Sequence, residues 1–195
     1  LMLKEIEIAI DMSLGTNKNS PGPIHLNIRF DEPLFDSGKK DITYIPKKFK
    51  IKKNYVSFKT PPFKRPLIVC GDLSANKLPD ILAIAKKLNS PIFADILSNM
   101  RECRSKNINV YYDYYIEHFT QNPDFILRFG KKPVSKKLNE FLNKNKNNTY
   151  LFESYIGFND NCPNIVKGLL SNNTFQANSK HKIDKKWLDH INFLE

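Results

Sequence analysis

A short hydrophobic run between a proline and a glycine constrains the fold of this chain most strongly. Residues 67–70 read Leu-Ile-Val-Cys, with Pro66 before them and Gly71 after them. A hydrophobic run of this length between breaker residues is typical of a strand buried on both faces. Residues 75–88 then place hydrophobic side chains at helical spacing, and Pro79 falls in the first turn, where proline is tolerated. The order strand, glycine turn, helix predicts the first half of a βαβ unit.

Further strands and helices alternate along the rest of the chain. Ser135 is a suitable N-cap for the helix that follows it. Residues 95–104 are expected to form a loop or a short helix, and residues 143–148 a polar loop. Strands that alternate with helices predict a parallel, three-layer, Rossmann-like α/β sheet with right-handed crossovers. The other expected strands are residues 91–94, 124–129, 149–155 and, as a fifth candidate, 165–170, and the other expected helices are residues 111–119, 136–142 and 183–194.

A different pattern precedes this sheet. Residues 2–14 have helical spacing and predict a helix that ends at Gly15. Residues 24–30 alternate hydrophobic and polar side chains, which predicts a strand. Residues 31–63 show no sustained period and carry four prolines and many lysines, which is typical of a connector between domains with at most one short strand. We therefore predict four regions: the end of one domain at 1–34, a linker at 35–65, a central Rossmann-like domain at 66–174, and a linker or helix at 175–195.

The chain is strongly basic, with a net charge of +11. Two interpretations are open: solvated lysines spread over the surface, or a surface for polyanions or small anions. Lysines cluster at residues 47–53 and 131–137, and no motif of a nucleic-acid-binding protein accompanies them. No hydrophobic run is long enough to span a bilayer, and no secretion signal opens the chain. Three widely spaced cysteines suit a reducing cytoplasm better than a disulfide scaffold.

The motifs of several enzyme classes are missing. The sequence has no G-x-G-x-x-G, no P-loop, no C-x-x-C, no H-E-x-x-H and no nucleophile elbow. The four histidines stand far apart in the sequence, so none has an evident ligand or catalytic partner. From the residues alone, the chain is a Rossmann-like α/β domain with basic loops, and no reaction is specified.

Four segments, taken in their order and spacing, are more specific than any single motif. Together they resemble the SEPHCHC synthase family, whose members are thiamine-diphosphate-dependent transferases of menaquinone and phylloquinone biosynthesis. The resemblance covers residues 2–142 well and the remaining residues weakly. The segments are residues 22–28 (GPIHLNI) with 32–34 (EPL), 71–74 (GDLS), 91–101 (PIFADILSNMR), and 124–130 (DFILRFG) with 133–136 (PVSK).

The resemblance implies a chain of three α/β domains that joins isochorismate to 2-oxoglutarate with loss of CO₂. Residues 1–34 would then end the pyrimidine-binding domain, and residues 175–195 would lead to the diphosphate-binding domain. The whole enzyme would use thiamine diphosphate with Mg²⁺ or Mn²⁺ and would form a homodimer or homotetramer. This chain would bind neither cofactor nor metal, because Leu73 follows Gly71-Asp72 where the family's G-D-G motif needs glycine. The activating glutamate would lie upstream of Leu1, so no catalytic residue and no activity are expected here.

The substrate contacts implied by the resemblance are basic. Lys136 and Lys137 match a pair that meets the isochorismate-derived part, and Ser135 precedes them. Ligands of open α/β sheets lie beyond the carboxyl ends of the strands, and helix N-termini there favour anions. Arg101, together with Arg104, follows another expected strand and is a candidate for the same rim. The alternative for all four cations is a solvated surface.

Two other functions remain open from the sequence. One is the central domain of a different thiamine-diphosphate decarboxylase or synthase, some of which bind nucleotides there. The other is a basic module for nucleic acid or another polyanion, for which binding would weaken steeply as salt is added.

Overall fold

The computed structural model describes residues 2–15, 21–27, 55–119, 121–153, 162–178 and 182–193. The chain divides into two compact units, Leu1–Lys53 and Asn54–Glu195. In the first unit, α1 (Met2–Leu14) is the helix that the sequence predicted. It ends at Gly15, whose φ of 66° lets its N–H bond to the carbonyl of Met12 at 3.2 Å.

The strand expected over residues 24–30 is wrong for residues 24–27, which have no regular secondary structure, and residues 28–30 lie outside the described residues. Alternation produces a strand only where a neighbouring strand takes up the backbone hydrogen bonds and one face is buried. No described strand pairs with residues 24–27, and the side chains of Ile24 and Leu26 are exposed.

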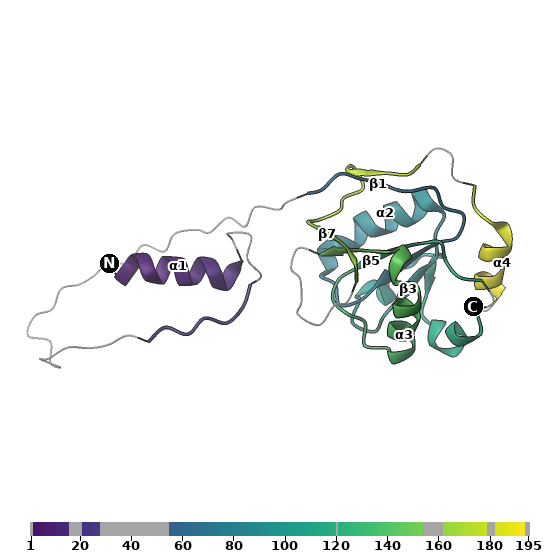
Figure 1. Ribbon diagram of the computed structural model, residues 1–195. Coiled ribbons are helices and arrows are strands. Elements are labelled where there is room, and N and C mark those ends of the chain that lie inside the picture. The colour runs from purple at the N-terminus through teal and green to yellow at the C-terminus, as the bar shows by residue number, and fades with distance from the viewer. Residues whose placement is uncertain are drawn as a thin grey trace, which may run out of the picture. The chain divides into compact units, whose positions relative to one another are not determined.

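The second unit is built on a six-stranded sheet in the order β4-β3-β2-β5-β6-β7 (Figure 1). Every neighbouring pair in it is parallel, so the predicted α/β fold is confirmed. The central strands β2 and β5 are buried along their whole length, as the hydrophobic runs predicted. The strands are β2 (Pro66–Cys70), β3 (Ile92–Ala94), β4 (Ile108–Asn109), β5 (Phe125–Phe129), β6 (Thr149–Glu153) and β7 (Asn164–Lys167).

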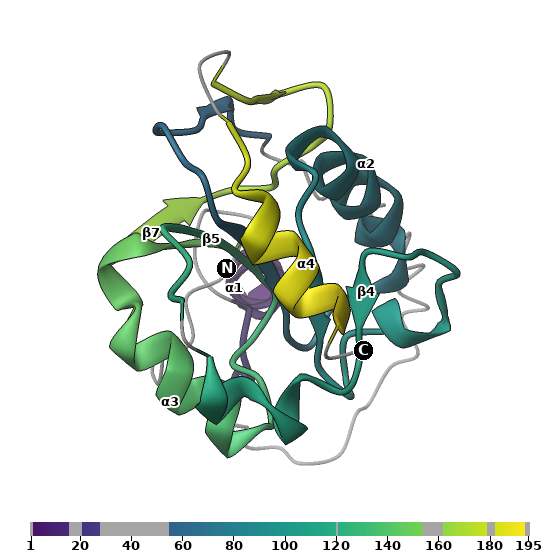
Figure 2. The ribbon, with the colours of Figure 1, turned by 90° about the vertical axis from the view of Figure 1, so that its right-hand side faces the viewer.

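Helices cover both faces of this sheet. The helix α2 (Leu78–Leu88) packs Ile81, Ile84 and Leu88 against one face, and α3 (Lys136–Lys144) lies on the other side of β5 (Figure 1). The helix α4 (Lys185–Phe193) packs on the same face as α3, and Figure 2 shows it in front, with α2 and α3 to either side. Its Trp187 is fully buried and donates its indole N–H to the carbonyl of Pro66 at 3.1 Å.

Several expected boundaries are corrected by the structure. The polar loop over residues 143–148 is wrong, because α3 continues to Lys144 and Lys146–Asn148 forms a 3₁₀ helix. The amide of Asn145 bonds to the carbonyl of Phe141 at 2.9 Å, so a polar side chain here satisfies the helix end. Residues 111–119 hold two 3₁₀ helices, Tyr112–Tyr114 and Ile116–His118, in place of one α-helix. The candidate strand at 165–170 is β7, which ends at Lys167.

Short strands are the elements that were hardest to predict from the sequence. The two-residue strands β4 and β8 (Phe175–Gln176) were not predicted. The strand β1 (Phe58–Lys59) is the one short strand that was expected within residues 31–63, and it pairs with β8 in a small parallel sheet. Two residues are too few to show a period of two. Residues 55–65 belong to the second unit, where Phe58 stacks against Phe125 and Phe63 lies in the core. None of the described helices is long and hydrophobic enough to cross a membrane.

Two glycines let the turns after β2 and β5 approach each other closely. A Cβ on Gly71 would meet the carbonyl oxygen of Lys131, and one on Gly130 would meet that of Asp72. Gly130 also has a φ of 79°, which is unfavourable for other residues. The Lys131 ammonium lies 3.1 Å from the Asp72 carboxylate across the same contact.

We therefore expect Gly130→Ala to lower the free energy of unfolding by about 2 kcal/mol or more, because positive φ and a backbone clash both oppose the new Cβ. Urea unfolding followed by the fluorescence of Trp187, the only tryptophan, measures it. Gly22→Ala is the control, since its Cβ would meet nothing within 4 Å. Equal stability of the Gly130→Ala and wild-type proteins would contradict the tight turn.

Candidate functional site

A buried carboxylate, Asp95, organises the carboxyl edge of the sheet. Asp95 follows β3 directly and is only 2% exposed. One of its oxygens accepts the Tyr112 hydroxyl at 3.0 Å, and the other accepts the N–H of Val134 at 2.8 Å. The N–H of Ser135 lies 3.5 Å from the first oxygen. A single side chain therefore connects the segments that follow β3, β4 and β5.

Tyr112 is held as a neutral donor in this arrangement. Its side chain is 1% exposed, and its ring stacks on Phe93 with centroids 5.1 Å apart. Burial raises the pKa of Tyr112 far above its usual range, and the neighbouring charge of Asp95 raises this pKa further. The hydroxyl group thus keeps its proton, which it donates to Asp95.

Ser135 begins α3 in the way that the sequence predicted. Its hydroxyl oxygen accepts the N–H of Leu138 at 3.0 Å, so its role as N-cap is confirmed. The same hydroxyl donates to a carboxylate oxygen of Asp113. Two carboxylates of the chain, Asp95 and Asp113, therefore lie at the start of this helix, where the helix dipole favours negative charge.

The two adjacent lysines have different surroundings. The Lys137 ammonium lies 2.7 Å from a Glu117 carboxylate oxygen and donates to the carbonyl of Asp113 at 3.3 Å. This hydrogen bond raises the pKa of Lys137 and lowers that of Glu117. The Lys136 side chain is 90% exposed, and its ammonium is 4.0 Å from Glu140. Successive residues of a helix point about 100° apart, so the pair divides between two directions.

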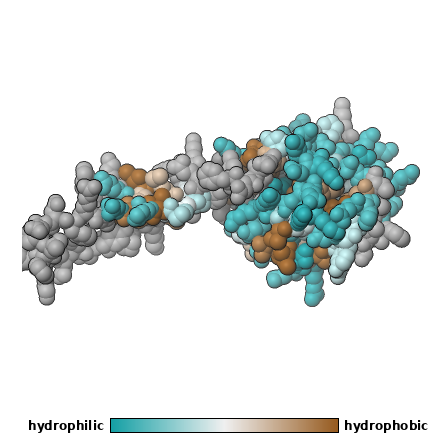
Figure 3. Space-filling view, turned by 60° about the horizontal axis from the view of Figure 1, so that its bottom comes forward, coloured by the Kyte–Doolittle hydropathy of each residue, from teal (hydrophilic) through white to brown (hydrophobic). Residues whose placement is uncertain are grey.

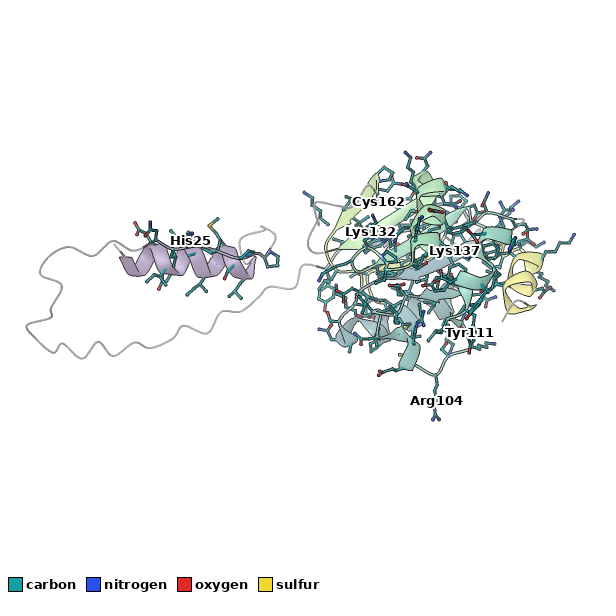
Figure 4. The ribbon with its side chains drawn as sticks, turned by 90° about the horizontal axis from the view of Figure 1, so that it is seen from below. His25, Arg104, Tyr111, Lys132, Lys137 and Cys162 are labelled. Carbon is teal, nitrogen blue, oxygen red and sulfur yellow. The ribbon has the colours of Figure 1, made fainter. Side chains whose placement is uncertain are left out.

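The two arginines of the expected rim also differ. Arg101 lies in the 3₁₀ helix Met100–Glu102, and its Nε donates to the carbonyl of Ala94 at 2.9 Å. It is close enough to Tyr112 for its charge to act on the pKa of that hydroxyl. Arg104 points away from Lys132 and Lys137 (Figure 4). The structure thus places Arg101 near Tyr112, which donates to Asp95, and Arg104 away from Lys137.

A cavity of about 380 Å³ opens beside Lys136. It is lined by α3, by the end of β5 and by the start of β6, with Arg128, Lys132 and Lys146 among its residues. Arg128 is 4% exposed although it lies in β5. The surface of the unit seen in Figure 3 is largely hydrophilic, with hydrophobic side chains confined to small areas.

The turn at Gly71-Asp72 is filled by the chain's own backbone at Gly130-Lys131, and Asp72 pairs with Lys131. In the part of the chain that the structure describes, no group of three or more His, Cys, Asp and Glu side chains is placed to hold a metal ion.

Sequence reasoning missed Asp95, Tyr112 and Asp113 as members of this cluster. Asp95 offered one usable signal, because a carboxylate directly after a buried strand lies where ligands and loops of an α/β sheet meet. Its partners Val134 and Tyr112 are distant in sequence, and no periodicity connects them.

Comparison with known proteins agrees with this fold. Residues 41–190 match a family model described as "Middle domain of thiamine pyrophosphate". Because the match covers well over half of the chain, the protein belongs to this family of thiamine pyrophosphate enzyme middle domains.

Several curated relatives share one name. The chain is 29% identical over 209 residues to the 2-succinyl-5-enolpyruvyl-6-hydroxy-3-cyclohexene-1-carboxylate synthase (SEPHCHC synthase) of Staphylococcus haemolyticus, covering 98% of this chain and 36% of the relative. It is 29% identical over 192 residues to the synthase of Staphylococcus saprophyticus, covering 89% of this chain and 33% of the relative. The chain therefore spans about a third of the length of these relatives. The expected resemblance to the synthase family is confirmed.

The hydrogen bond from Tyr112 to Asp95 leads to a prediction about stability. Tyr112→Phe should lower the free energy of unfolding by about 1–3 kcal/mol at neutral pH, because a buried carboxylate loses a donor. Since the pKa of Tyr112 is higher in the folded protein than in the unfolded one, this stabilisation is present at neutral pH. It should shrink as the pH rises above about 10, where the unfolded tyrosine ionises.

Urea unfolding of both proteins across this pH range is the measurement. Tyr114→Phe is the matched control, because Tyr114 is 82% exposed and should tolerate loss of its hydroxyl. If Tyr112→Phe and Tyr114→Phe are equally stable at neutral pH, the Asp95 cluster does not hold the edge of the sheet.

Proposed function

We propose that this chain is the central domain of a thiamine-diphosphate-dependent synthase that joins isochorismate and 2-oxoglutarate with loss of CO₂. The observation that carries the proposal is the shared name of the relatives, which align over nearly the whole chain. The basic carboxyl edge of the sheet supports it, because both substrates bear carboxylates. In this proposal the domain supports its neighbours and supplies basic substrate contacts.

Lys136 is the principal contact in this proposal. The Ser135 cap and the Asp95 hydrogen bonds fix the start of α3, so the position of Lys136 is well defined. Its ammonium is exposed and has only a distant carboxylate beside it, so a substrate carboxylate can take a charge-assisted hydrogen bond from it. Lys137 and Ser135 act as secondary contacts. The charge of Lys137 is offset by Glu117, and the hydroxyl of Ser135 already donates to Asp113. Arg101 is a further contact on the same edge.

The remaining expectations complete the proposal. Residues 1–34 end a pyrimidine-binding domain, and 35–65 form a linker whose residues 55–65 pack into the core of the second unit. Residues 66–174 form the central domain, and 175–195 lead to a diphosphate-binding domain. The whole enzyme uses thiamine diphosphate with Mg²⁺ or Mn²⁺, forms a homodimer or homotetramer, and works in the cytoplasm on the way to menaquinone or phylloquinone.

The chain by itself should be inactive. Its Gly71-Asp72 turn is occupied by its own backbone, so we expect no micromolar binding of thiamine diphosphate with Mg²⁺ and no decarboxylation of 2-oxoglutarate. Calorimetric titration of the 195-residue chain with cofactor and Mg²⁺ checks this. A saturable micromolar isotherm would show that a cofactor site lies within the chain.

Lys136→Ala tests the substrate contact in a protein that joins this chain to the two cofactor-binding domains. The change should lower kcat/KM for isochorismate by roughly tenfold to a hundredfold, the range expected for a lost charge-assisted hydrogen bond. Use of 2-oxoglutarate should change much less, and Lys137→Ala should have a smaller effect than Lys136→Ala.

Steady-state kinetics with each substrate varied in turn gives the answer, and a thermal melt verifies folding. Lys86→Ala is the control, because Lys86 is an exposed lysine of α2, on the opposite face of the sheet. A well-folded Lys136→Ala enzyme that stays within about twofold of the control would refute the assignment of Lys136 to the isochorismate site.

A further inference from the structure

Exposed hydrophobic side chains gather at the carboxyl edge of the sheet. Among the described residues of the second unit, five of the six large hydrophobic side chains that are exposed belong to the segments after β3, β4 and β5. Their exposed fractions run from 51% to 82%. A single exposed hydrophobic residue is ordinary, but a group of them marks a surface that binds another molecule. The five side chains, called here the hydrophobic edge surface, are Ile96, Leu97, Tyr111, Tyr114 and Val134.

The hydrogen bonds of Asp95 hold the three segments of this surface together. Its two leucine-like side chains, at positions 96 and 97, follow Asp95 directly in the chain. Val134 donates its backbone N–H to the Asp95 carboxylate at 2.8 Å. The two exposed tyrosines lie on either side of Tyr112, whose hydroxyl donates to the same carboxylate at 3.0 Å. The five side chains are therefore neighbours of one buried group, although they are distant in sequence.

The turn after β3 presents its two hydrophobic side chains in a fixed position. The Ser98 hydroxyl donates to the carbonyl of Asp95 at 2.6 Å, and the Asn99 amide donates to the carbonyl of Leu73 at 2.6 Å. Ile96 and Leu97 stand between these anchors and are nevertheless exposed. A surface that is already ordered before it binds loses little conformational entropy on binding, so this turn is suited to docking.

The charges of the neighbouring loops indicate the chemistry of the partner. The loops after β3 and β5 together expose five basic side chains and one carboxylate, that of Glu102. The segment after β4 adds Glu117, whose charge is already offset by Lys137. A second copy of this chain would bring the same positive charges to the contact, which opposes self-association. The basic side chains are Arg101, Arg104, Lys106, Lys131 and Lys132, and Figure 4 shows Arg104 on the same side of the unit as Tyr111.

We propose that the hydrophobic edge surface is a docking site for another domain of the same protein, whose contact face presents hydrophobic side chains with carboxylates around them. This chain spans about a third of the length of its relatives, so most of each relative lies outside the matched region. The proposal rests on the proposed function only in taking this chain as one domain of a longer protein. Its five hydrophobic side chains are not among the proposed substrate contacts.

Hydroxyl-radical footprinting tests the proposal by measuring side-chain exposure directly. The 195-residue chain is compared with a protein that joins it to the two cofactor-binding domains, without substrate or thiamine diphosphate. We expect Tyr111 and Tyr114 to be oxidised severalfold more slowly in the longer protein. Equal rates in the two proteins would overturn the proposal. An active longer protein with equal rates would leave the proposed function standing, and slowed oxidation with an unimportant Lys136 would leave the docking site standing.

Substitutions locate the contact. Tyr111→Ser and Ile96→Ser should leave the melting temperature of the 195-residue chain unchanged, because both side chains are exposed in it. Each should lower the melting temperature of the longer protein, where the proposed contact buries them. Tyr55→Ser is the matched control, since Tyr55 is 48% exposed, Tyr111 is 54% exposed, and Tyr55 lies outside this surface. If Tyr111→Ser and Ile96→Ser affect the longer protein no more than Tyr55→Ser does, the surface is not a docking site.

Sedimentation of the 195-residue chain tests the other occupant, a second copy. We expect a monomer at all concentrations, because the basic loops repel each other. A dimer that Ile96→Ser abolishes would assign the hydrophobic edge surface to self-association and would overturn the proposal.

Discussion

The hydrogen bonds of the Asp95 carboxylate are the interaction on which the carboxyl edge of the sheet depends. Burying a carboxylate to 2% exposure is costly unless hydrogen-bond donors surround it. Asp95 accepts hydrogen bonds from the Tyr112 hydroxyl and the Val134 N–H, and the Ser135 N–H lies at longer range. Each hydrogen bond to a charged group contributes about 1.5–3 kcal/mol. Since the donors come from segments after two other strands, Asp95 fixes the loops relative to one another.

The carboxylates around the start of α3 also bear on the charges of Lys136 and Lys137. A cation in the first turn of a helix is unfavourable unless an anion lies beside it. In the structure, Asp95 and Asp113 already lie at the start of α3, and Glu117 pairs with Lys137. The chain's own carboxylates thus account for Lys137, and Lys136 is the member of the pair whose charge is presented to the solvent.

Local patterns in the sequence were enough to predict most of the fold. The runs at β2, β3, β5 and β6 and the helical spacing in α1, α2, α3 and α4 are properties of neighbouring residues, so they could be seen without the structure. Cys70 ends the hydrophobic run of β2 and is buried with it, and this burial raises the pKa of its thiol. The two-residue strand β4 and the cluster around Asp95 could not be predicted. Both depend on contacts between distant segments, such as the 39 residues that separate Asp95 from Val134.

Amide hydrogen exchange of residues 130–138 in the wild-type protein and in an Asp95→Asn variant tests the central claim most directly. We predict that the wild-type N–H groups of Val134 and Leu138 are protected, and that Asp95→Asn loses protection in this segment while β2 and β5 keep theirs. Asparagine retains one acceptor oxygen and removes the charge, so the sheet itself should survive. If exchange in residues 130–138 is the same in both proteins, Asp95 does not fix the start of α3.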